Sequence, residues 1–357
     1  MNLRKNMLIP AAALVLLVSS CNYLDVSDQL AGGLQNTDEV FENVSYTKRW
    51  YASIFTGIPD YSGLNSTNVN GFKNPWASIC DELVTGYGNA SKYNNSDKNA
   101  TNVSFHRYGD CYKAIRQANI FLQKAHVITA GGTQGDELLE PELKRYQANA
   151  RFMRAFYHYL LFEQYGPIII VGDKVYEATE SQDMSRNSVD EVVEYLDKEL
   201  LASADELSQE PIIDENYRAE PTKGVALAVR AKMWVYAASP LLNGGFNEAL
   251  NIANPDGKKL FPIADAAKWE RARQACADFI NYANENNRYE LYYAAPEKNG
   301  VVNPEKSVYE LFQKYTKEII WATATADWGA WMVMLSIAVL CLVPNKTDWD
   351  LLALRRN

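Results

Sequence analysis

Apolar residues recur at helical spacing along most of the chain. The pattern predicts helices over residues 37–57, 110–125, 141–164, 188–207, 222–238 and 264–284. Local signals mark some of the ends, because Ser188 and Glu191 have the spacing of a capping box and Gly166 and Pro167 end the third helix. The apolar run 168–171 that follows is expected to be extended.

The predicted helices carry alanine and other small residues on one face, which lets neighbouring helices approach closely. Such faces are typical of helix-pair repeats of the tetratricopeptide type, although no strict period of about 34 residues is visible. We therefore predict a mostly α fold, a right-handed scaffold of tetratricopeptide-like helix pairs with long loops. An irregular helical domain is the alternative that the periodicity leaves open.

Residues 58–104 lack this helical pattern. They are rich in Gly, Asn, Ser and Tyr, with short apolar islands such as the one that begins at Trp76. A loop of this length in a compact domain is more often functional than idle. The loop is therefore the first place to expect binding residues.

The N-terminus has the layout of a secretory signal over residues 1–20, with basic residues, an apolar run and small residues in that order. Val18 to Cys21 resemble a bacterial lipobox, in which the cysteine thiol receives a diacylglycerol and palmitate-type acyl chains anchor the protein. We predict that Cys21 is the lipid anchor and that residues 21–36 form a polar tether. A plain signal peptide followed by an ordinary cysteine is the alternative.

The chain has 357 residues, a formal net charge of −9 and a pI near 5.1. No basic patch is present that would neutralise phosphates, so a nucleic-acid partner is not expected. The 22 Tyr and 8 Trp residues exceed what a core of this size needs. Their flat apolar faces and polar edges suit a surface that recognises ligands.

The sequence contains no recognisable catalytic or cofactor motif. No GxSxG, HExxH, phosphate-binding loop or dinucleotide fingerprint occurs. The chain has three histidines, far apart in the sequence, so a histidine-based metal site is not expected. Besides Cys21, the cysteines are Cys80, Cys111, Cys276 and Cys341, and their disulfide state stays open. We predict a protein that is not an enzyme, with no catalytic residues, no cofactor and no metal.

Four segments, in one order along the chain, carry a family resemblance. The first is Cys21 followed by Leu-Asp, and the second is the helix from Arg151 that ends in Tyr-Gly-Pro. The third begins Thr-Lys-Gly at Thr222 and ends in YAASPL, and the fourth begins at Lys268 and ends in YELY at Tyr292. Together they resemble the SusD/RagB family, nutrient-binding outer-membrane lipoproteins of Bacteroidetes.

The resemblance implies a SusD-like helical domain over residues 37–330 and a lipid-anchored position on the outer membrane, facing the cell exterior. It also implies a function: the protein binds oligosaccharides or other nutrients and delivers them to a SusC-like TonB-dependent transporter. Arg151, Arg154 and His158 share one helix face, and we interpret them as helix-packing residues rather than a catalytic set.

Sugar recognition requires exposed aromatic faces with polar neighbours. The candidate ligand-binding residues are Trp76, Asp81, Tyr87, Tyr93, Trp321 and Trp328. The alternative for Trp76 and Trp321 is that they anchor the core beneath long loops. Two other functions stay open for the chain as a whole: a structural scaffold of the transporter complex built on helix-pair repeats, and a glycoside hydrolase, which would need two paired carboxylates.

Residues 331–357 form an atypical tail, which opens with an apolar run from Trp331 to Val343 that has no polar face; counted from Trp328, the stretch is 16 residues long. About 16 residues is marginal for a membrane span, and a buried core segment is a second interpretation. A third is a shift of reading frame: with suitable codons, reading from one base before Trp331 gives the polar string MDGDAFDRR. We hypothesise that the tail is out of frame, so that the chain lacks much of the family's C-terminal region. Resequencing the gene tests this.

Overall fold

The structure is a computed structural model that describes residues 36–59, 106–129, 137–177, 180, 183–296, 300–311, 313–324 and 331–336. The predicted signal segment, the tether as far as residue 35 and nearly all of the 58–104 loop lie outside these residues. Secondary structure in the described part is mostly helical, as the apolar periodicity predicts.

The α-helices are α3 (Thr37–Phe41), α4 (Val44–Ile54), α7 (Tyr108–Lys124), α8 (Glu140–Tyr165), α9 (Val189–Glu206), α10 (Lys223–Ala238), α11 (Ala267–Asn284) and α12 (Pro304–Leu311). Short 3-10 turns are η2 (Phe55–Gly57), η3 (Ala249–Asn251) and η4 (Glu285–Asn287). The strands β1 (Ile319–Ala324) and β2 (Trp331–Ser336) pair antiparallel in a two-stranded sheet.

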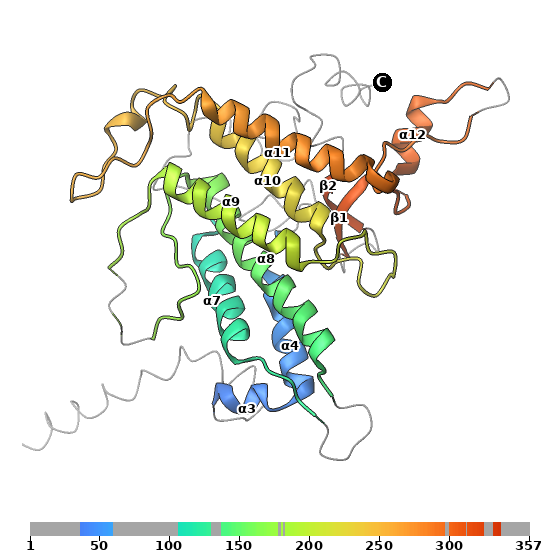
Figure 1. Ribbon diagram of the computed structural model, residues 1–357, viewed down its shortest axis with the longest axis horizontal. Helices are drawn as coiled ribbons and strands as arrows, with labels where there is room; N and C mark the ends of the chain where they lie inside the picture. The colour runs from blue at the N-terminus through green and yellow to red at the C-terminus, as the bar shows by residue number, and fades with distance from the viewer. Residues whose placement is uncertain are drawn as a thin grey trace, which may run out of the picture.

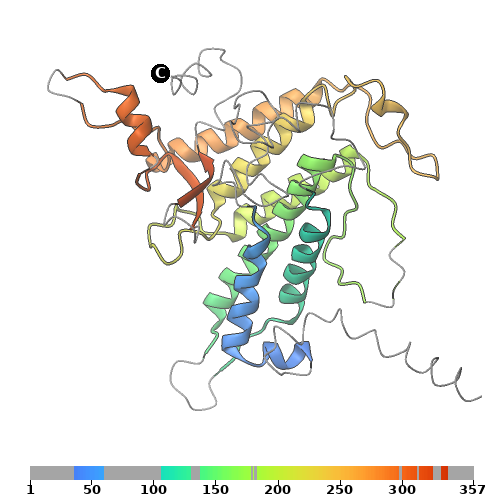
Figure 2. The same ribbon diagram turned by 180° about the vertical axis from the view of Figure 1, so that it is seen from behind.

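Successive long helices pack against one another, α4 on α7, α7 on α8, α8 on α9, α9 on α10 and α10 on α11. Figure 1 shows a lower group of α4, α7 and α8 and an upper group of α9, α10 and α11, and the view from behind in Figure 2 keeps the same grouping. The prediction of a mostly α scaffold of packed helix pairs is confirmed.

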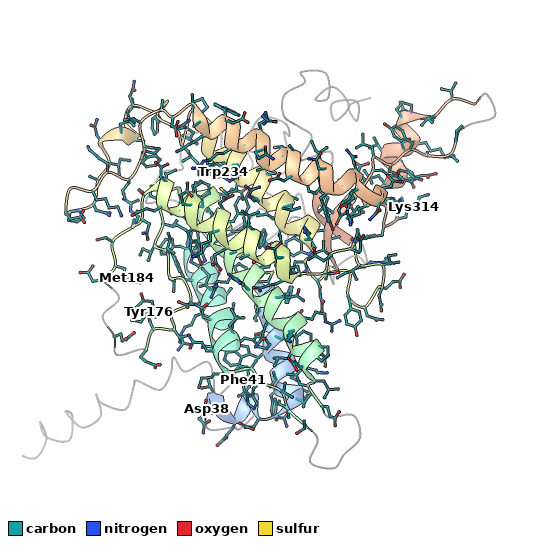
Figure 3. The ribbon with its side chains drawn as sticks, in the orientation of Figure 1. Asp38, Phe41, Tyr176, Met184, Trp234 and Lys314 are labelled. Atoms are coloured by element: carbon teal, nitrogen blue, oxygen red, sulfur yellow. The ribbon has the colours of Figure 1, made fainter. Side chains whose placement is uncertain are left out.

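Aromatic rings fill the lower group. Phe41 is 1% exposed and lies 5.3 Å from the Trp50 ring and 6.1 Å from the Phe121 ring, measured between centroids. Figure 3 shows Phe41 among α3, α4 and α7. Burial of these three rings therefore joins the short N-terminal helices to α7.

Charged side chains form hydrogen bonds between the helices of the upper group. Asp197 on α9 accepts hydrogen bonds from Arg230 Nε and Trp234 Nε1, both on α10 and both at 2.6 Å. Arg230 also donates to Asp278 on α11 at 2.8 Å. The guanidinium of Arg230 is therefore paired on both sides, which satisfies the charge of a residue only 9% exposed. Trp234 is placed among these helices in Figure 3.

The first predicted helix is interrupted. A single helix over residues 37–57 was expected, but α3 ends at Phe41 and α4 begins at Val44. The Asn43 side chain accepts a hydrogen bond from the Tyr46 backbone N–H at 3.1 Å and so caps a new helix. Apolar spacing alone does not detect this break because the spacing continues across it.

Side-chain hydrogen bonds act at the starts of two predicted helices, as a capping box before α9 and outside the helix before α11. Ser188 precedes α9, and both hydrogen bonds of the Ser188–Glu191 capping box are present. The last predicted helix was expected from residue 264, but α11 begins at Ala267. Asn243 exchanges two hydrogen bonds with the Asp265 backbone, at 2.8 and 2.9 Å, and holds that residue outside the helix.

The apolar run after α8 is extended but belongs to no sheet. Tyr112 on α7 donates from its hydroxyl to the Ile169 carbonyl and accepts from the Ile169 N–H. The next N–H, that of Ile170, donates to the Asn187 side chain at 2.9 Å. Side chains thus supply the hydrogen bonds that a neighbouring strand would otherwise supply.

Only residues 331–336 of the atypical tail are described, and they form β2, a strand rather than a helix. Among the described residues, none of the helices combines the length and apolar character needed to cross a bilayer. The hypothesis of a shifted reading frame stays a prediction, as do the proposed limits of the signal, tether, domain and tail.

Candidate functional site

Arg154 lies at the junction of three helices. The residue is on α8 and is 8% exposed. Its guanidinium donates to Glu199 Oε2 on α9 at 2.8 Å and to Asn119 Oδ1 on α7 at 3.3 Å. Burying this charge is tolerable because a carboxylate and an amide oxygen replace the lost water.

Asn119 also binds the segment that follows α8. Its amide donates to the carbonyls of Gly172 and Lys174, at 3.0 and 3.1 Å. His158, which is fully buried, lies one turn beyond Arg154 and accepts at Nε2 from the Val171 N–H at 3.4 Å. The same polar network therefore fixes the segment around residues 171–174 against α7 and α8.

The hydrogen bonds of His158 require its neutral form. Nδ1 lies 2.8 Å from the Arg154 carbonyl, so Nδ1 donates and Nε2 is left to accept from Val171. Burial lowers the pKa of His158 to about 4, which keeps the ring neutral at physiological pH. His158 is thus a structural hydrogen-bonding residue in this arrangement.

Arg151 completes the row of polar residues on this face of α8. It forms ion pairs with Glu206 and with Glu199, the latter at 3.5 Å. The interpretation of Arg151, Arg154 and His158 as helix-packing residues is confirmed by these contacts. Within the described residues, no group of three or more His, Cys, Asp or Glu side chains is arranged to hold a metal ion.

The third and fourth segments that carry the resemblance meet in space. Gly224 is the second residue of α10, and a Cβ atom there would lie 2.6 Å from the Tyr289 hydroxyl oxygen. The Tyr289 side chain is 4% exposed and also packs near Phe279, with 6.0 Å between ring centroids. A glycine is needed at residue 224 because the tyrosine occupies the space of its missing side chain.

Trp321 is the one candidate ligand-binding residue that the structure describes, and it is buried. Its ring is 0% exposed and lies edge-on to Phe152 and Phe156, at 5.7 and 5.1 Å between centroids. Its indole N–H donates to the Ala219 carbonyl at 2.9 Å. The prediction of a sugar-stacking role is wrong for Trp321, because no face of the ring is open. The core-anchor alternative is the one that holds.

The other candidate ligand-binding residues, Trp76, Asp81, Tyr87, Tyr93 and Trp328, lie outside the described residues. Their assignment stays a prediction. Cys111 is buried on α7, whereas Cys80 lies outside the described residues, so whether these two cysteines form a disulfide stays open.

The loop between α9 and α10, residues 207–222, is held at four consecutive positions. The Arg145 guanidinium lies over the Tyr217 ring, and Arg218 lies over the Tyr315 ring, 4.4 and 4.9 Å from the centroids. The next two residues bind through hydrogen bonds, since the Ala219 carbonyl accepts from Trp321 and Glu220 accepts from the Tyr51 hydroxyl; the second bond is 3.2 Å long.

The first half of the same loop is bonded to Tyr282 on α11 and to Arg288, the residue after η4. The Tyr282 hydroxyl donates to the Gln209 carbonyl at 2.7 Å, and Arg288 pairs with Glu210 at 2.6 Å. At the base, the Lys223 N–H donates to the Ser208 carbonyl at 2.9 Å. Figures 1 and 2 both show this olive segment beside β1. The apolar pattern of the chain does not mark this loop as functional; the signal it carries is the aromatic Tyr217 among acidic and amide residues.

The fold and the family are known from comparison. The protein BT4246 aligns with a TM-score of 0.58 at 23% identity, over 79% of this chain and 51% of that one. A laminarin-binding SusD-like protein aligns with a TM-score of 0.51 at 16% identity, over 81% of this chain and 54% of that one. At these identities the likeness shows the fold alone. No curated protein matches the chain.

A family model, SusD-like and described as "Starch-binding associating with outer membrane", matches residues 35–235. Because the match covers more than half of the chain, the protein belongs to the SusD-like family. The predicted family membership is therefore confirmed. The chain spans about half the length of the solved structures that it matches.

The Glu199–Arg154 pair predicts a dependence of stability on pH. Burial raises the pKa of Glu199, but the hydrogen bond and charge of Arg154, together with Arg151, outweigh burial and hold the pKa below its ordinary 4.5. A lowered pKa in the folded state stabilises the fold above pH 4.5, and this contribution is lost as the pH falls through the folded-state value. Glu199→Gln should cost about 2 kcal/mol at pH 7 and should weaken the loss of stability on acidification.

Urea denaturation at several pH values measures both effects. Glu206→Gln is the matched control, because the Glu206 side chain is 44% exposed and its pair with Arg151 is expected to contribute below about 1 kcal/mol. An acid dependence that is identical in wild type and Glu199→Gln would contradict the assignment.

The burial of Trp321 predicts a large effect of truncation. Trp321→Ala should lower the free energy of unfolding by about 3–5 kcal/mol, because it leaves a cavity beside Phe152 and Phe156. Trp269→Ala, at a ring that is 49% exposed on α11, should change it by about 0.5 kcal/mol or less. Denaturant titration of both variants is the measurement, and equal effects would place Trp321 outside the core.

Proposed function

We propose that the chain is a glycan-binding protein of the outer-membrane surface. The observation that carries the proposal is the SusD-like family match over residues 35–235, the same part of the chain that contains α3 to α9 and most of α10. The polar contacts of Arg154 and His158 support the proposal. Both residues belong to a segment that carries the family resemblance, and their hydrogen bonds hold the helices of that scaffold together.

The proposed ligand class is a neutral oligosaccharide. The family description names starch, and one structural relative is described as laminarin-binding. Both polymers are built of uncharged glucose units. The net charge of −9 also disfavours polyanionic ligands, which would be repelled by a predominantly negative protein.

The proposed role is capture and transfer rather than catalysis. The family description names binding and association with a membrane and names no reaction. Passing the ligand to a SusC-like TonB-dependent transporter follows from the resemblance alone and is part of the proposal. A scaffold of the transporter complex without any glycan affinity is the competing function.

The proposed location is the outer face of the outer membrane, with the lipidated sulfur of Cys21 as the anchor. The family description supports association with the outer membrane. The lipobox-like residues before Cys21 support the chemistry of the anchor, since two or more acyl chains hold a protein stably.

Glycan binding is tested with the purified protein on immobilised starch and laminarin, together with an assay of reducing ends. We expect retention on one of the two polymers and no release of reducing ends over hours. Turnover of either glycan would support the hydrolase alternative. Co-purification of a large β-barrel without retention on any glycan would support the scaffold.

The anchor is tested by Cys21→Ala expressed in a Bacteroidetes host. We expect loss of metabolic labelling with a palmitate analogue and release of the protein from the membrane fraction. Cys276→Ala, which changes a partly exposed cysteine on α11, should keep both properties. Acyl labelling that persists in Cys21→Ala would contradict the assignment.

A further inference from the structure

A stack of side chains runs from the surface of the 207–222 loop into the core. Tyr217 is 39% exposed, and the Arg145 guanidinium covers one side of its ring at 4.4 Å from the centroid. The same guanidinium lies 5.3 Å from the centroid of the Tyr146 ring. Tyr146 in turn stacks on Tyr51, with 3.9 Å between centroids and 19° between planes. An exposed ring is therefore the outermost layer of a stack that ends on α4.

The buried end of this stack is fixed by hydrogen bonds. Tyr51 is 8% exposed, and its hydroxyl accepts from Asn149 at 2.7 Å and donates to Glu220 at 3.2 Å. Glu220 also lies 3.7 Å from Arg145 Nε. Because these bonds join α4, α8 and the loop, the position of Tyr217 follows from the packing of the helices.

Contacts on both sides of the exposed ring hold the loop in place. Its second half is held at each residue from 217 to 220, and its first half is held by Tyr282 and Arg288. A ligand that binds here meets a surface that is already formed. Little conformational entropy is then lost on binding, which favours affinity from a small contact area.

Polar residues precede Tyr217 at the tip of the loop. Asp214, Glu215 and Asn216 are exposed, and Asp214 Oδ1 accepts from both the backbone N–H and the side-chain amide of Asn216 at 2.9 and 3.0 Å. Carboxylate and amide groups of this kind hydrogen-bond to sugar hydroxyls.

The charges near the stack disfavour an anionic ligand. Arg145 lies 4.0 Å from Glu142 and 3.7 Å from Glu220, and Glu142 is also paired with Lys48 at 3.0 Å. At the tip, Glu215 is paired with Arg218 at 3.4 Å, whereas Asp214 adds an exposed carboxylate. The carboxylates therefore slightly outnumber the cations, so a uronic acid or a sulfated sugar finds no net attraction here, and a neutral sugar does not need any.

From these contacts we propose that Tyr217 is a sugar-stacking residue, whose face opposite Arg145 packs on a pyranose ring of a neutral oligosaccharide. Asp214 and Asn216 are the polar groups within reach of the hydroxyls of the bound sugar. Arg145 is a positioning residue, because it holds the tyrosine ring from behind. The proposal rests on the glycan-binding function proposed above and gives that function a contact residue on the α9–α10 loop.

The test is calorimetric titration of the protein with maltoheptaose and with laminarihexaose. In Tyr217→Ala the dissociation constant for whichever glycan the wild type binds should rise about tenfold, the value expected for the loss of one stacking contact. Tyr217→Phe keeps the ring and Tyr217→Trp enlarges it, so both should bind within about twofold of wild type.

Tyr309→Ala is the matched control, because Tyr309 lies on α12 and is 64% exposed. It should leave the dissociation constant unchanged. A structural effect alone would weaken binding in the Trp variant as well, because the larger ring would disturb the stack with Arg145.

The outcomes separate the two proposals. If the wild type binds one of the glycans and Tyr217→Ala binds it equally well, the subsite is overturned and the glycan-binding function stands. If the wild type binds neither glycan, the proposed function and the subsite are both overturned. Equal weakening in the Ala and Trp variants would also overturn the stacking role.

Discussion

The burial of the middle of α8 on all sides is the constraint on which the rest of the described structure depends. Every residue from Phe152 to Phe162 is buried, so this part of the helix has no face for water. Its polar side chains must then find partners inside the protein. Arg154 and His158 do so on α7, on α9 and on the segment after α8, and these partners fix where the neighbouring elements lie.

The same constraint separates two kinds of aromatic residue. Trp321 lies on β1 and packs against the buried middle of α8, where its ring is part of the core. Tyr217 lies near the first turns of α8, where the helix is only partly covered, and its ring stays accessible. The two residues are joined through the loop, because the carbonyl of Ala219 accepts the hydrogen bond from the Trp321 indole. The buried Trp321 and the exposed Tyr217 are thus connected through a hydrogen bond to the same loop.

Sequence patterns predicted what depends on local spacing. The long helices and the Ser188 capping box follow from residues close together in the chain. The burial of Trp321 was not predictable in this way, since its neighbours on α8 are more than 160 residues earlier. Tyr217 was missed for the same reason: only the folded structure brings Arg145, Tyr146 and Tyr51 into line beneath it.

The clamped halves of the α9–α10 loop leave residues 211–216 as a short span between two fixed points. The entropy of closing such a span grows only with the logarithm of its length, so insertions and substitutions there disturb the helices little. On the proposed subsite, an exchange of this tip would change the groups offered to a ligand while the scaffold is retained. The same property makes the tip a suitable position for grafting a new recognition sequence by design.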